Sequence, residues 1–316
     1  MRIEKASARE FAAGHWLRID TRSAPRRVWV MLQAMRVNQW VKNALIFVPL
    51  IAAHKVSTPG LFWDGCTAFL SFSFCASGIY LINDIVDVEA DRRHPTKRDR
   101  PIAAGQLSRQ AAMILAVACI GASLVTASTL PVIFLMVLAS YLLITVAYSV
   151  WLKSIAILDV LTLAGLYTVR IFAGAVAVVV PLSPWLLAFS MFVFLSLAFV
   201  KRYAELRLLE KAGRTEALGR AYIQKDLPSL YSMGTASGYI AVLVLALYIN
   251  SDHVVSLYRR PEYLWALCPL AIYWISRMWF RAARGELHDD PIIAAFEDRQ
   301  SLIVGVLAAV AMVAAL

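Results

Sequence analysis

The chain has 316 residues, of which 60% are hydrophobic and only 16% are charged, and its mean hydropathy is +0.66. This composition excludes an ordinary soluble protein and indicates an integral membrane protein. The net charge of +10 is concentrated in loops, so it predicts membrane topology and attraction to anionic membrane lipids rather than a nucleic-acid partner.

The first 28 residues are polar and carry scattered arginines in place of a compact apolar core. They do not match a signal peptide, and we expect residues 1–28 to form a flexible cytoplasmic tail. The rest of the chain, residues 29–316, is expected to form a single transmembrane domain.

Nine apolar segments follow the tail, and most reach the roughly 20 residues that a bilayer-spanning helix requires. They predict an all-α membrane protein, because open sheet edges cannot be satisfied in lipid. The first segment is short, although an amphipathic stretch leads into it. The nine segments are residues 41–54, 61–82, 110–130, 132–151, 155–180, 185–200, 229–250, 262–280 and 300–316.

The lysines and arginines fix the expected orientation of these spans. Of 31 such residues, 27 lie at the amino terminus or in loops on the same side, whereas only Lys55, Arg259 and Arg260 lie in loops on the other side. Because short cytoplasmic loops are enriched in lysine and arginine, the amino terminus is predicted inside and, with nine spans, the carboxyl terminus outside.

A polar stripe is predicted at the start of the first span. Arg36, Gln39, Lys42 and Asn43 recur at helical spacing, so their side chains can enter the bundle from one face. Interfacial anchoring by the basic residues and Trp40 is an alternative that is compatible with this role.

The second span ends in a cluster of oxygen ligands, Asn83, Asp84, Asp87 and Asp91. If the helix continues, these side chains share one face. Mg²⁺ favours a few carboxylates, several waters and the oxygens of a substrate phosphate, so this face predicts a magnesium site. The alternative is a solvated helix end whose acids pair with nearby arginines.

The loop that follows, residues 94–105, is basic and is stiffened by Pro95 and Pro101. Its cations Lys97, Arg98 and Arg100 lie a short distance beyond the carboxylates. A metal beside cations suits a pyrophosphate leaving group, whose charge both would neutralise. Alternatively, these residues only obey the positive-inside rule.

The fourth span carries Tyr148 near its cytoplasmic end, and Lys153 follows it, while the fifth span contains Asp159 and Arg170. The last two are about 16 Å apart along a helix, so they cannot pair with each other. Charges within a span are costly and favour a functional role, although a structural partner on another helix remains an alternative for each.

The sixth span runs into Lys201, Arg202 and Glu205, whose spacing also fits a salt-bridged helix extension. The polar stretch from there to Pro228 suits a lid over a cytoplasmic cavity. Before the last span, Asp290 and Pro291 have the form of a helix N-cap followed by Pro at the first helical position. We therefore favour structural roles for the preceding pair, residues 288–289.

These motifs together resemble the UbiA superfamily of intramembrane prenyltransferases. Within it, the segments at 38–43 (NQWVKN), 83–91 (NDIVDVEAD), 94–105 (HPTKRDRPIAAG) and 201–206 (KRYAEL) are similar to the decaprenyl-phosphate phosphoribosyltransferase branch. The likeness covers about residues 30–316. It implies a ring of nine helices around a central cavity that opens to the cytoplasm and the lipid, in the cytoplasmic membrane of a bacterium.

Conventional members of the superfamily bind a prenyl diphosphate through two aspartate-rich motifs and transfer the prenyl group to an aromatic acceptor. Here the second motif is missing, and Lys201, Arg202, Tyr203 and Glu205 stand in its place. The resemblance therefore implies the branch in which phosphoribosyl pyrophosphate is the donor and a polyprenyl phosphate is the acceptor. The product, a lipid-linked phosphoribose, would be a precursor of a pentose (arabinose) donor.

The implied mechanism is displacement at the anomeric carbon, with Asp84, Asp87 and Asp91 as the catalytic residues. Mg²⁺ would be held by these three and Asn83. The acceptor phosphate is already an anion, so no strong general base is needed. Residues implied to bind the two substrates are Lys42, Asn43, Lys97, Arg98, Arg100, Tyr148, Lys153, Arg170, Lys201, Tyr203 and Glu205.

Two other functions fit parts of the pattern. One is an aromatic prenyltransferase for a quinone or haem side chain, with a prenyl diphosphate donor. The other is a lipid-phosphate transporter, which would also place cations in a membrane cavity. The acid cluster argues against transport because, without metal, it would repel an anionic lipid, and the sequence shows no inverted repeats.

Overall fold

The computed structural model describes residues 26–93, 97–211, 221–287 and 290–316. The predicted tail at residues 1–28 therefore lies almost wholly outside the described residues. So do His94 and Pro95 of the basic loop, residues 212–220 of the predicted lid, and the pair His288 and Asp289.

Within these ranges the secondary structure is helical, with no β-strand. The α-helices are α2 (Arg26–Ala34), α3 (Val48–Ala52), α4 (Pro59–Val86), α5 (Val88–Arg93), α6 (Arg109–Ala127), α7 (Val132–Val150), α8 (Leu158–Ala177), α9 (Pro184–Lys211), α10 (Leu227–Ile249), α11 (Asp252–Leu257), α12 (Leu267–Arg284), α13 (Pro291–Glu297) and α14 (Arg299–Ala315). Short 3₁₀ helices are η1 (Val37–Phe47), η2 (Lys97–Asp99), η3 (Leu152–Ser154), η4 (Gln224–Asp226) and η5 (Pro261–Ala266).

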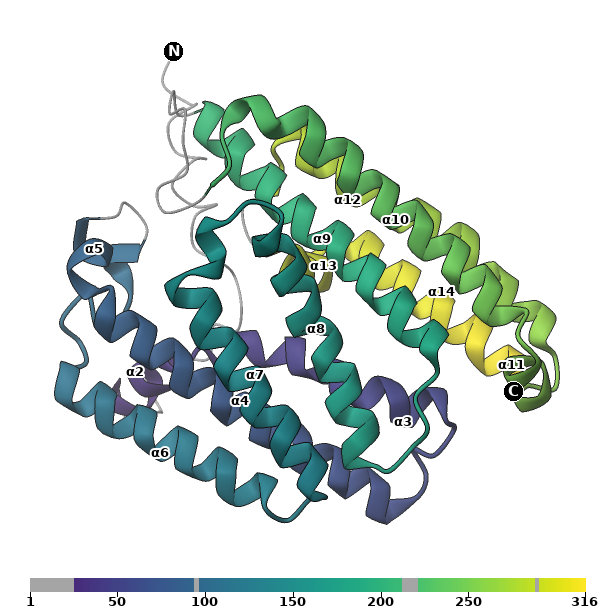
Figure 1. The fold of residues 1–316 in the computed structure, drawn as a ribbon, viewed down its shortest axis with the longest axis horizontal. Helices are drawn as coiled ribbons and strands as arrows, with labels where there is room; N and C mark the ends of the chain where they lie inside the picture. Colours follow the sequence, from purple (N-terminus) through teal and green to yellow (C-terminus); the bar gives the residue numbers. More distant parts are fainter. Residues whose placement is uncertain (1–25, 94–96, 212–220, 288–289) are drawn as a thin grey trace.

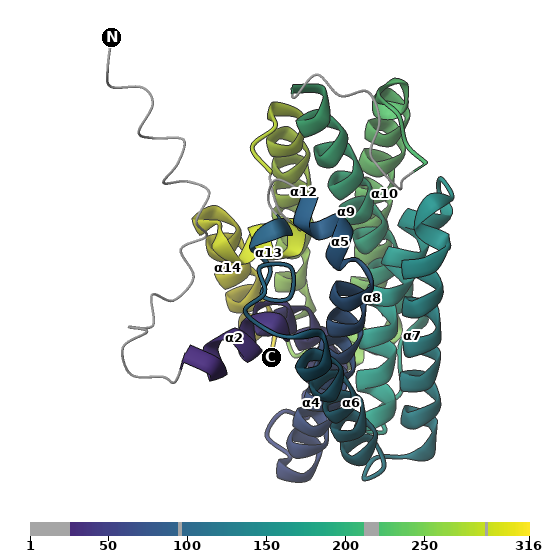
Figure 2. The ribbon, with the colours of Figure 1, turned by 90° about the vertical axis from the view of Figure 1, so that its left-hand side faces the viewer.

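The long helices lie side by side in a bundle and successive ones run in alternating directions (Figures 1 and 2). α4 packs along α6, and α9 packs between α8 and α10. The C-terminal ends of α4, α7, α9 and α12 therefore gather at one end of the bundle, the upper left in Figure 1. The described lysines and arginines near or beyond these helix ends include Arg100, Lys153, Lys201 and Arg281, so this end of the bundle is basic.

The protein is a multi-pass membrane protein. Among the described residues, the helices α4, α6, α7, α8, α9 and α10 are long and apolar enough to cross a membrane. Large apolar side chains such as Val125 on α6, Leu143 on α7 and Leu243 on α10 are exposed, as expected for surfaces that face lipid. α13 and α14, which meet at an angle of 84°, would add a seventh span.

The predicted count of nine spans is not confirmed. The segment at 41–54 forms η1 and the five-residue α3 instead of one long helix. The segment at 262–280 forms η5 and α12, and α12 carries Arg277, Arg281 and Arg284 on an otherwise apolar helix. η1 and α3 are each shorter than a membrane span, and the three arginines of α12 lower its hydropathy below that of a lipid-facing span.

η1 is a 3₁₀ helix of 11 residues, which is long for this helix type. In a 3₁₀ helix, residues three apart lie on the same side. Trp40, Asn43 and Ile46 therefore point together towards the neighbouring helices, where Trp40 Nε1 donates to Ser77 Oγ at 3.0 Å. Lys42 lies on the adjacent side, so η1 presents its lysine and asparagine to different partners.

Gly174 lets η1 approach α8 closely. A Cβ atom at this position would lie 2.0 Å from the carbonyl oxygen of Ile46, which is backbone and cannot rotate away. Gly165, on the same helix, has open space around it. The absence of a side chain at Gly174 thus fixes the depth at which η1 and its polar residues sit in the bundle.

We expect Gly174→Ala to destabilise the protein by about 1–3 kcal/mol, because the added methyl group must push η1 away from α8. The melting temperature of the detergent-purified protein measures this. Gly165→Ala is the matched control and should be neutral or slightly stabilising, since alanine is a better helix former than glycine. Equal losses for the two variants would contradict the close-approach argument.

Candidate functional site

Two carboxylates of the predicted acid cluster converge at the basic end of the bundle. Asp84 and Asp91 are 4% and 3% exposed. Nη1 of Arg100 is 3.1 Å from Oδ1 of Asp84 and 2.6 Å from Oδ2 of Asp91. Arg36, which precedes η1, donates from Nη2 to Asp84 Oδ1 at 2.6 Å. One guanidinium nitrogen thus bridges two buried carboxylates, so the two are close enough to share a single cation.

The other two predicted metal ligands lie differently. Asn83 donates from Nδ2 to Ser149 Oγ on α7 at 3.2 Å. Asp87 is exposed at the C-terminus of α4, where the regular helix breaks before α5 begins at Val88. Within the described residues no three histidine, cysteine, aspartate or glutamate side chains form a group that could hold a metal ion. The structure therefore brings together two of the four predicted ligands.

The predicted phosphate-binding cations are divided in the same way. Arg100 contacts the acid cluster, whereas Lys97 and Arg98 are exposed on η2. Lys153 is partly exposed on η3. The basic loop thus sends one of its three predicted cations into the cluster.

A second charged cluster joins distant parts of the chain through Asp290. Its Oδ2 atom is 2.9 Å from Nζ of Lys42 on η1 and 2.7 Å from Nζ of Lys201 on α9. Tyr167 on α8 donates from its hydroxyl to the same carboxylate at 3.3 Å. The side chains of Lys42 and Asp290 are buried, whereas that of Lys201 is 34% exposed and marks the open edge of the cluster.

Asp290 also performs the role that the sequence predicted for it. Its Oδ1 atom accepts from the backbone N–H of Ile292 at 3.2 Å, which makes it the N-cap of α13, and Pro291 follows at the first helical position. Burial by itself disfavours the carboxylate, but the ammonium groups of Lys201 and Lys42 outweigh this, so the pKa of Asp290 lies well below its usual range. The carboxylate is therefore ionised at neutral pH.

Arg170 is held by partners on three elements. Its Nε donates to Asn43 Oδ1 at 2.8 Å, Nη2 donates to the hydroxyl of Tyr141 at 2.9 Å, and Nη1 donates to the carbonyl oxygen of Leu166. Asn43 in turn donates to Ser73 Oγ at 3.0 Å. The buried guanidinium thus ties η1 and α7 to α8, which favours the structural alternative over phosphate binding.

Asp159 also has a structural partner on another helix. Its carboxylate receives two hydrogen bonds from the guanidinium of Arg202 on α9, and both side chains are buried. Tyr148 donates to Asp159 Oδ1 at 2.8 Å, and Arg202 donates to Glu205 Oε2 at 2.5 Å. The predicted site residues Tyr148 and Glu205 therefore belong to this network, which fastens α7 and α8 to α9.

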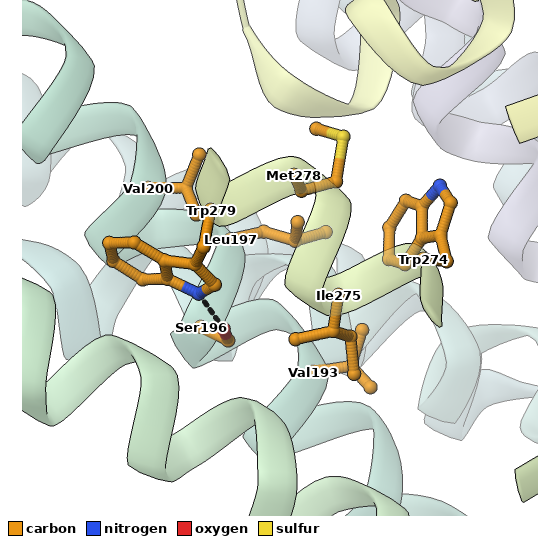
Figure 3. A pocket seen from close by; sticks show the side chains of 8 residues that line it. All are labelled: Val193, Ser196, Leu197, Val200, Trp274, Ile275, Met278 and Trp279. Atoms are coloured by element: carbon orange, nitrogen blue, oxygen red, sulfur yellow. Dashed lines mark hydrogen bonds between the residues drawn. The ribbon is translucent and has the colours of Figure 1, made fainter. Parts of the chain in front are cut away.

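Tyr203 packs in an aromatic group with Tyr231 and Trp279, whose ring centroids both lie 5.8 Å from its own. Beside this group, a narrow apolar crevice lies between α9 and α12, where Trp279 Nε1 donates to Ser196 Oγ at 3.1 Å (Figure 3). The crevice is lined by Val193, Ser196, Leu197, Val200, Trp274, Ile275, Met278 and Trp279. The crevice has no room for a water molecule, so these side chains are part of the packed core between α9 and α12.

Tyr80 lies beside the acid cluster, where its ring is under the guanidinium of Arg36, 4.8 Å from the ring centroid. One cluster offers buried carboxylates for a hard cation, and the other offers two ammonium groups for an anion. Together they can bind a molecule that carries more than one phosphate group.

Sequence analysis assigned no site role to Asp290 or Tyr80, and it placed Arg36 in the polar stripe without counting it among the substrate-binding residues. Asp290 was recognised only as a helix cap, because its lysine partners lie in remote segments. For Arg36, the polar stripe with Lys42 was a usable signal, since a basic residue on the same side of η1 must meet whatever α4 presents. Arg202 was expected in a salt-bridged extension of the sixth span, and its pairing with Asp159 bears out the alternative of a structural partner on another helix.

A model of the UbiA prenyltransferase family matches residues 44–296 of the chain. The uncharacterized protein y4nM of Sinorhizobium fredii is 37% identical over 93% of this chain and 57% of that protein. The nodulation protein NoeC of Azorhizobium caulinodans is 34% identical over 86% of this chain and 88% of that protein. The decaprenyl-phosphate phosphoribosyltransferase of Mycolicibacterium smegmatis is 41% identical over 64% of this chain and 63% of that protein. The chain thus spans less than two thirds of the first and third of these relatives.

The fold is also that of a solved structure, a UbiA homolog from Archaeoglobus fulgidus bound to GPP and Mg²⁺. The two superpose with a TM-score of 0.67 over 89% of this chain and 99% of that one, at 17% sequence identity. This likeness concerns the fold.

We expect Asp159→Asn to destabilise the protein by about 3–5 kcal/mol, because it leaves the buried guanidinium of Arg202 without its carboxylate partner. Denaturant unfolding of the detergent-purified protein measures this loss. Glu205→Gln alters the more exposed partner of the same arginine and should cost at most about 1 kcal/mol. A loss for Asp159→Asn no larger than that of the control would show that the pair is not structural.

Proposed function

The chain belongs to the UbiA prenyltransferase family, and we propose that it transfers 5-phosphoribose from phosphoribosyl pyrophosphate to a polyprenyl phosphate. Pyrophosphate would be released. The product would be a lipid-linked phosphoribose, used as a precursor of a pentose (arabinose) donor.

The observation that carries this proposal is the pair of lysines that converge on Asp290. Conventional family members are expected to carry a second acidic motif after the sixth predicted span, whereas this chain places Lys201 there, beside Lys42. Ammonium groups suit a phosphate and do not bind a second metal ion. The similarity to the mycobacterial decaprenyl-phosphate phosphoribosyltransferase points to the same reaction.

The residues of the acid cluster fit a divalent cation. Mg²⁺ commonly uses one or two carboxylates together with waters and substrate phosphate oxygens, and Asp84 and Asp91 already converge on one point, which the guanidinium of Arg100 occupies. Asp84 and Asp91 would hold the ion, with Asn83 and Asp87 as further candidates. When bound, the ion would neutralise charge on the departing pyrophosphate.

The remaining steps fall to the chain's own side chains. An oxygen of the acceptor phosphate attacks the anomeric carbon as the bond from that carbon to the pyrophosphate oxygen breaks. Arg100 and Arg36 are positioned to turn from the carboxylates to the pyrophosphate and stabilise its developing charge. Lys42 and Lys201 hold a phosphate group in place, and the aspartates and lysines act without transferring a proton.

We place this end of the bundle on the cytoplasmic side of a bacterial cytoplasmic membrane. The basic loops gather there (Figure 1), and cytoplasmic loops are enriched in lysine and arginine. Phosphoribosyl pyrophosphate, a soluble metabolite, would enter from the same side.

The proposal predicts that purified protein moves a ribose label from phosphoribosyl pyrophosphate into the lipid phase when polyprenyl phosphate and Mg²⁺ are present. A chelator should abolish the transfer. If the protein instead consumed a prenyl diphosphate with an aromatic acceptor, the prenyltransferase alternative would replace this one. Activity in neither assay would favour lipid-phosphate transport.

Asp84→Asn and Asp91→Asn should each lower kcat/KM by about 100-fold or more, because each removes a charge that would bind the cation at the departing pyrophosphate. Titration with Mg²⁺ should show that both variants bind the metal more weakly and need a higher Mg²⁺ concentration for activity. Asp99→Asn changes an exposed acid of the same loop and should leave the activity near wild type. Full metal-dependent activity in folded Asp91→Asn protein would refute the assignment.

A further inference from the structure

We propose that Lys42 and Lys201 form a binding site for a phosphate monoester, and that Asp290 fills this site as an internal stand-in until the phosphate displaces it. The inference rests on the proposed function, since both of its substrates carry such a group. The lipid acceptor ends in one, and phosphoribosyl pyrophosphate carries another at the 5 position of its ribose.

The geometry is that of an anion site. Two ammonium groups from opposite regions of the chain approach one oxygen atom, Oδ2 of Asp290, at 2.9 and 2.7 Å. These are the distances of charge-assisted hydrogen bonds. Each ammonium group has three N–H donors, so two lysines can serve several oxygens of a phosphate in place of the single oxygen they now share.

The charge balance of the cluster points the same way. Among the described residues, two cations share one carboxylate, and the side chains of Lys42 and Asp290 are 9% and 8% exposed. A surplus positive charge in such a place is costly unless an anion joins it. Lys201, at 34% exposed, gives a ligand access from the open edge of the cluster.

This cluster differs from the buried pair of Asp159 and Arg202. There a planar guanidinium makes two hydrogen bonds to one carboxylate, which is a closed arrangement that fixes two helices. Lysine is a point charge on a flexible stem, so its partner can be exchanged with little loss of geometry. The lysine cluster is therefore suited to ligand exchange.

Asp290 can withdraw from the lysines without unfolding its own helix. The oxygen that caps α13 is Oδ1, which accepts from Ile292 N–H, whereas Oδ2 faces the lysines. The exchange of a carboxylate for a phosphate also keeps Lys42 neutralised throughout, so the buried ammonium group is never left without a counter-charge. Asp290 thereby lowers the affinity for phosphate and preserves the shape of the site.

Asp290→Asn tests this inference, because asparagine keeps an N-cap oxygen but removes the competing charge. Full-length protein in detergent is titrated by calorimetry with farnesyl phosphate, ribose 5-phosphate and inorganic phosphate. We expect Asp290→Asn to bind at least one of the two esters about tenfold more tightly than wild type. The ester that shows the gain identifies the source of the phosphate, and a gain with inorganic phosphate would show that the phosphate group alone suffices.

Lys201→Gln is the second variant, since its partly exposed position tolerates replacement, and it should bind the same ester about tenfold more weakly than wild type. Asp298→Asn is the matched control: Asp298 caps α14 and pairs with Arg277, so this variant has the same chemical change at a different cap. It should leave all phosphate affinities unchanged.

The stand-in is refuted if Asp290→Asn binds every probe as weakly as wild type or more weakly. General damage to the fold cannot produce the expected gain in affinity. If Asp290→Asn does not fold, unchanged affinity in Lys201→Gln refutes the site. If the wild-type protein transfers phosphoribose but the variants show no change in phosphate affinity, the stand-in role of Asp290 is rejected and the proposed function is kept. If the affinities change as expected but the wild-type protein transfers no phosphoribose, the phosphate site is kept and the proposed function is rejected.

Discussion

A charge buried among apolar helices must have a counter-charge, and this constraint organises the basic end of the bundle. Each buried carboxylate of the described residues there is matched by a cation from another segment: Asp84 by Arg36 and Arg100, Asp91 by Arg100, Asp159 by Arg202, and Asp290 by Lys42 and Lys201. These pairs join η1, α4, α8, α9 and the start of α13. The polar residues of the site therefore also hold the ends of these elements together.

The networks differ in how many hydrogen-bond donors of their cations remain available to a ligand. The donors of Arg170 are directed to Asn43, Tyr141 and Leu166, and Arg202 is bound bidentately by Asp159, so both arginines serve to fasten helices. The lysines at Asp290 and the arginines at Asp84 are arranged otherwise, because several cations there share few carboxylate oxygens. Binding of phosphate is accordingly expected at these two places.

Much of this could be predicted from sequence, since it depends on local pattern. Apolar length identified the six helices from α4 to α10 that qualify as spans, excluding the short α5, and the spacing of Asp84 and Asp91 indicated that they could approach each other. Asp290 was correctly predicted as the cap of α13. Each of these features is set by residues within a few turns of one another.

What could not be predicted depends on contacts between distant segments. Lys42 meets Asp290 from the other end of the chain, and no spacing rule relates them. The nine-span count is not confirmed, because the segment at 41–54 forms the 3₁₀ helix η1 and the short α3, a break that hydropathy does not detect. Asp87 was expected on the same helix face as Asp91. That expectation required one continuous helix, but α4 ends at Val86, and the side chain of Asp87 is exposed.

The charge of the two clusters bears on how a polyphosphate could bind. Asp84, Asp91 and Asp290 face Arg36, Arg100, Lys42 and Lys201, so the clusters together hold a surplus of one positive charge. A pyrophosphate with a further phosphate monoester brings several negative charges and exceeds this surplus. If the protein binds such a substrate, as we propose, a cation would enter with it at Asp84 and Asp91, and the departure of Asp290 would free the lysines. Both adjustments would replace an internal ion pair by one that includes the substrate, so binding would be coupled to a rearrangement of the same few side chains.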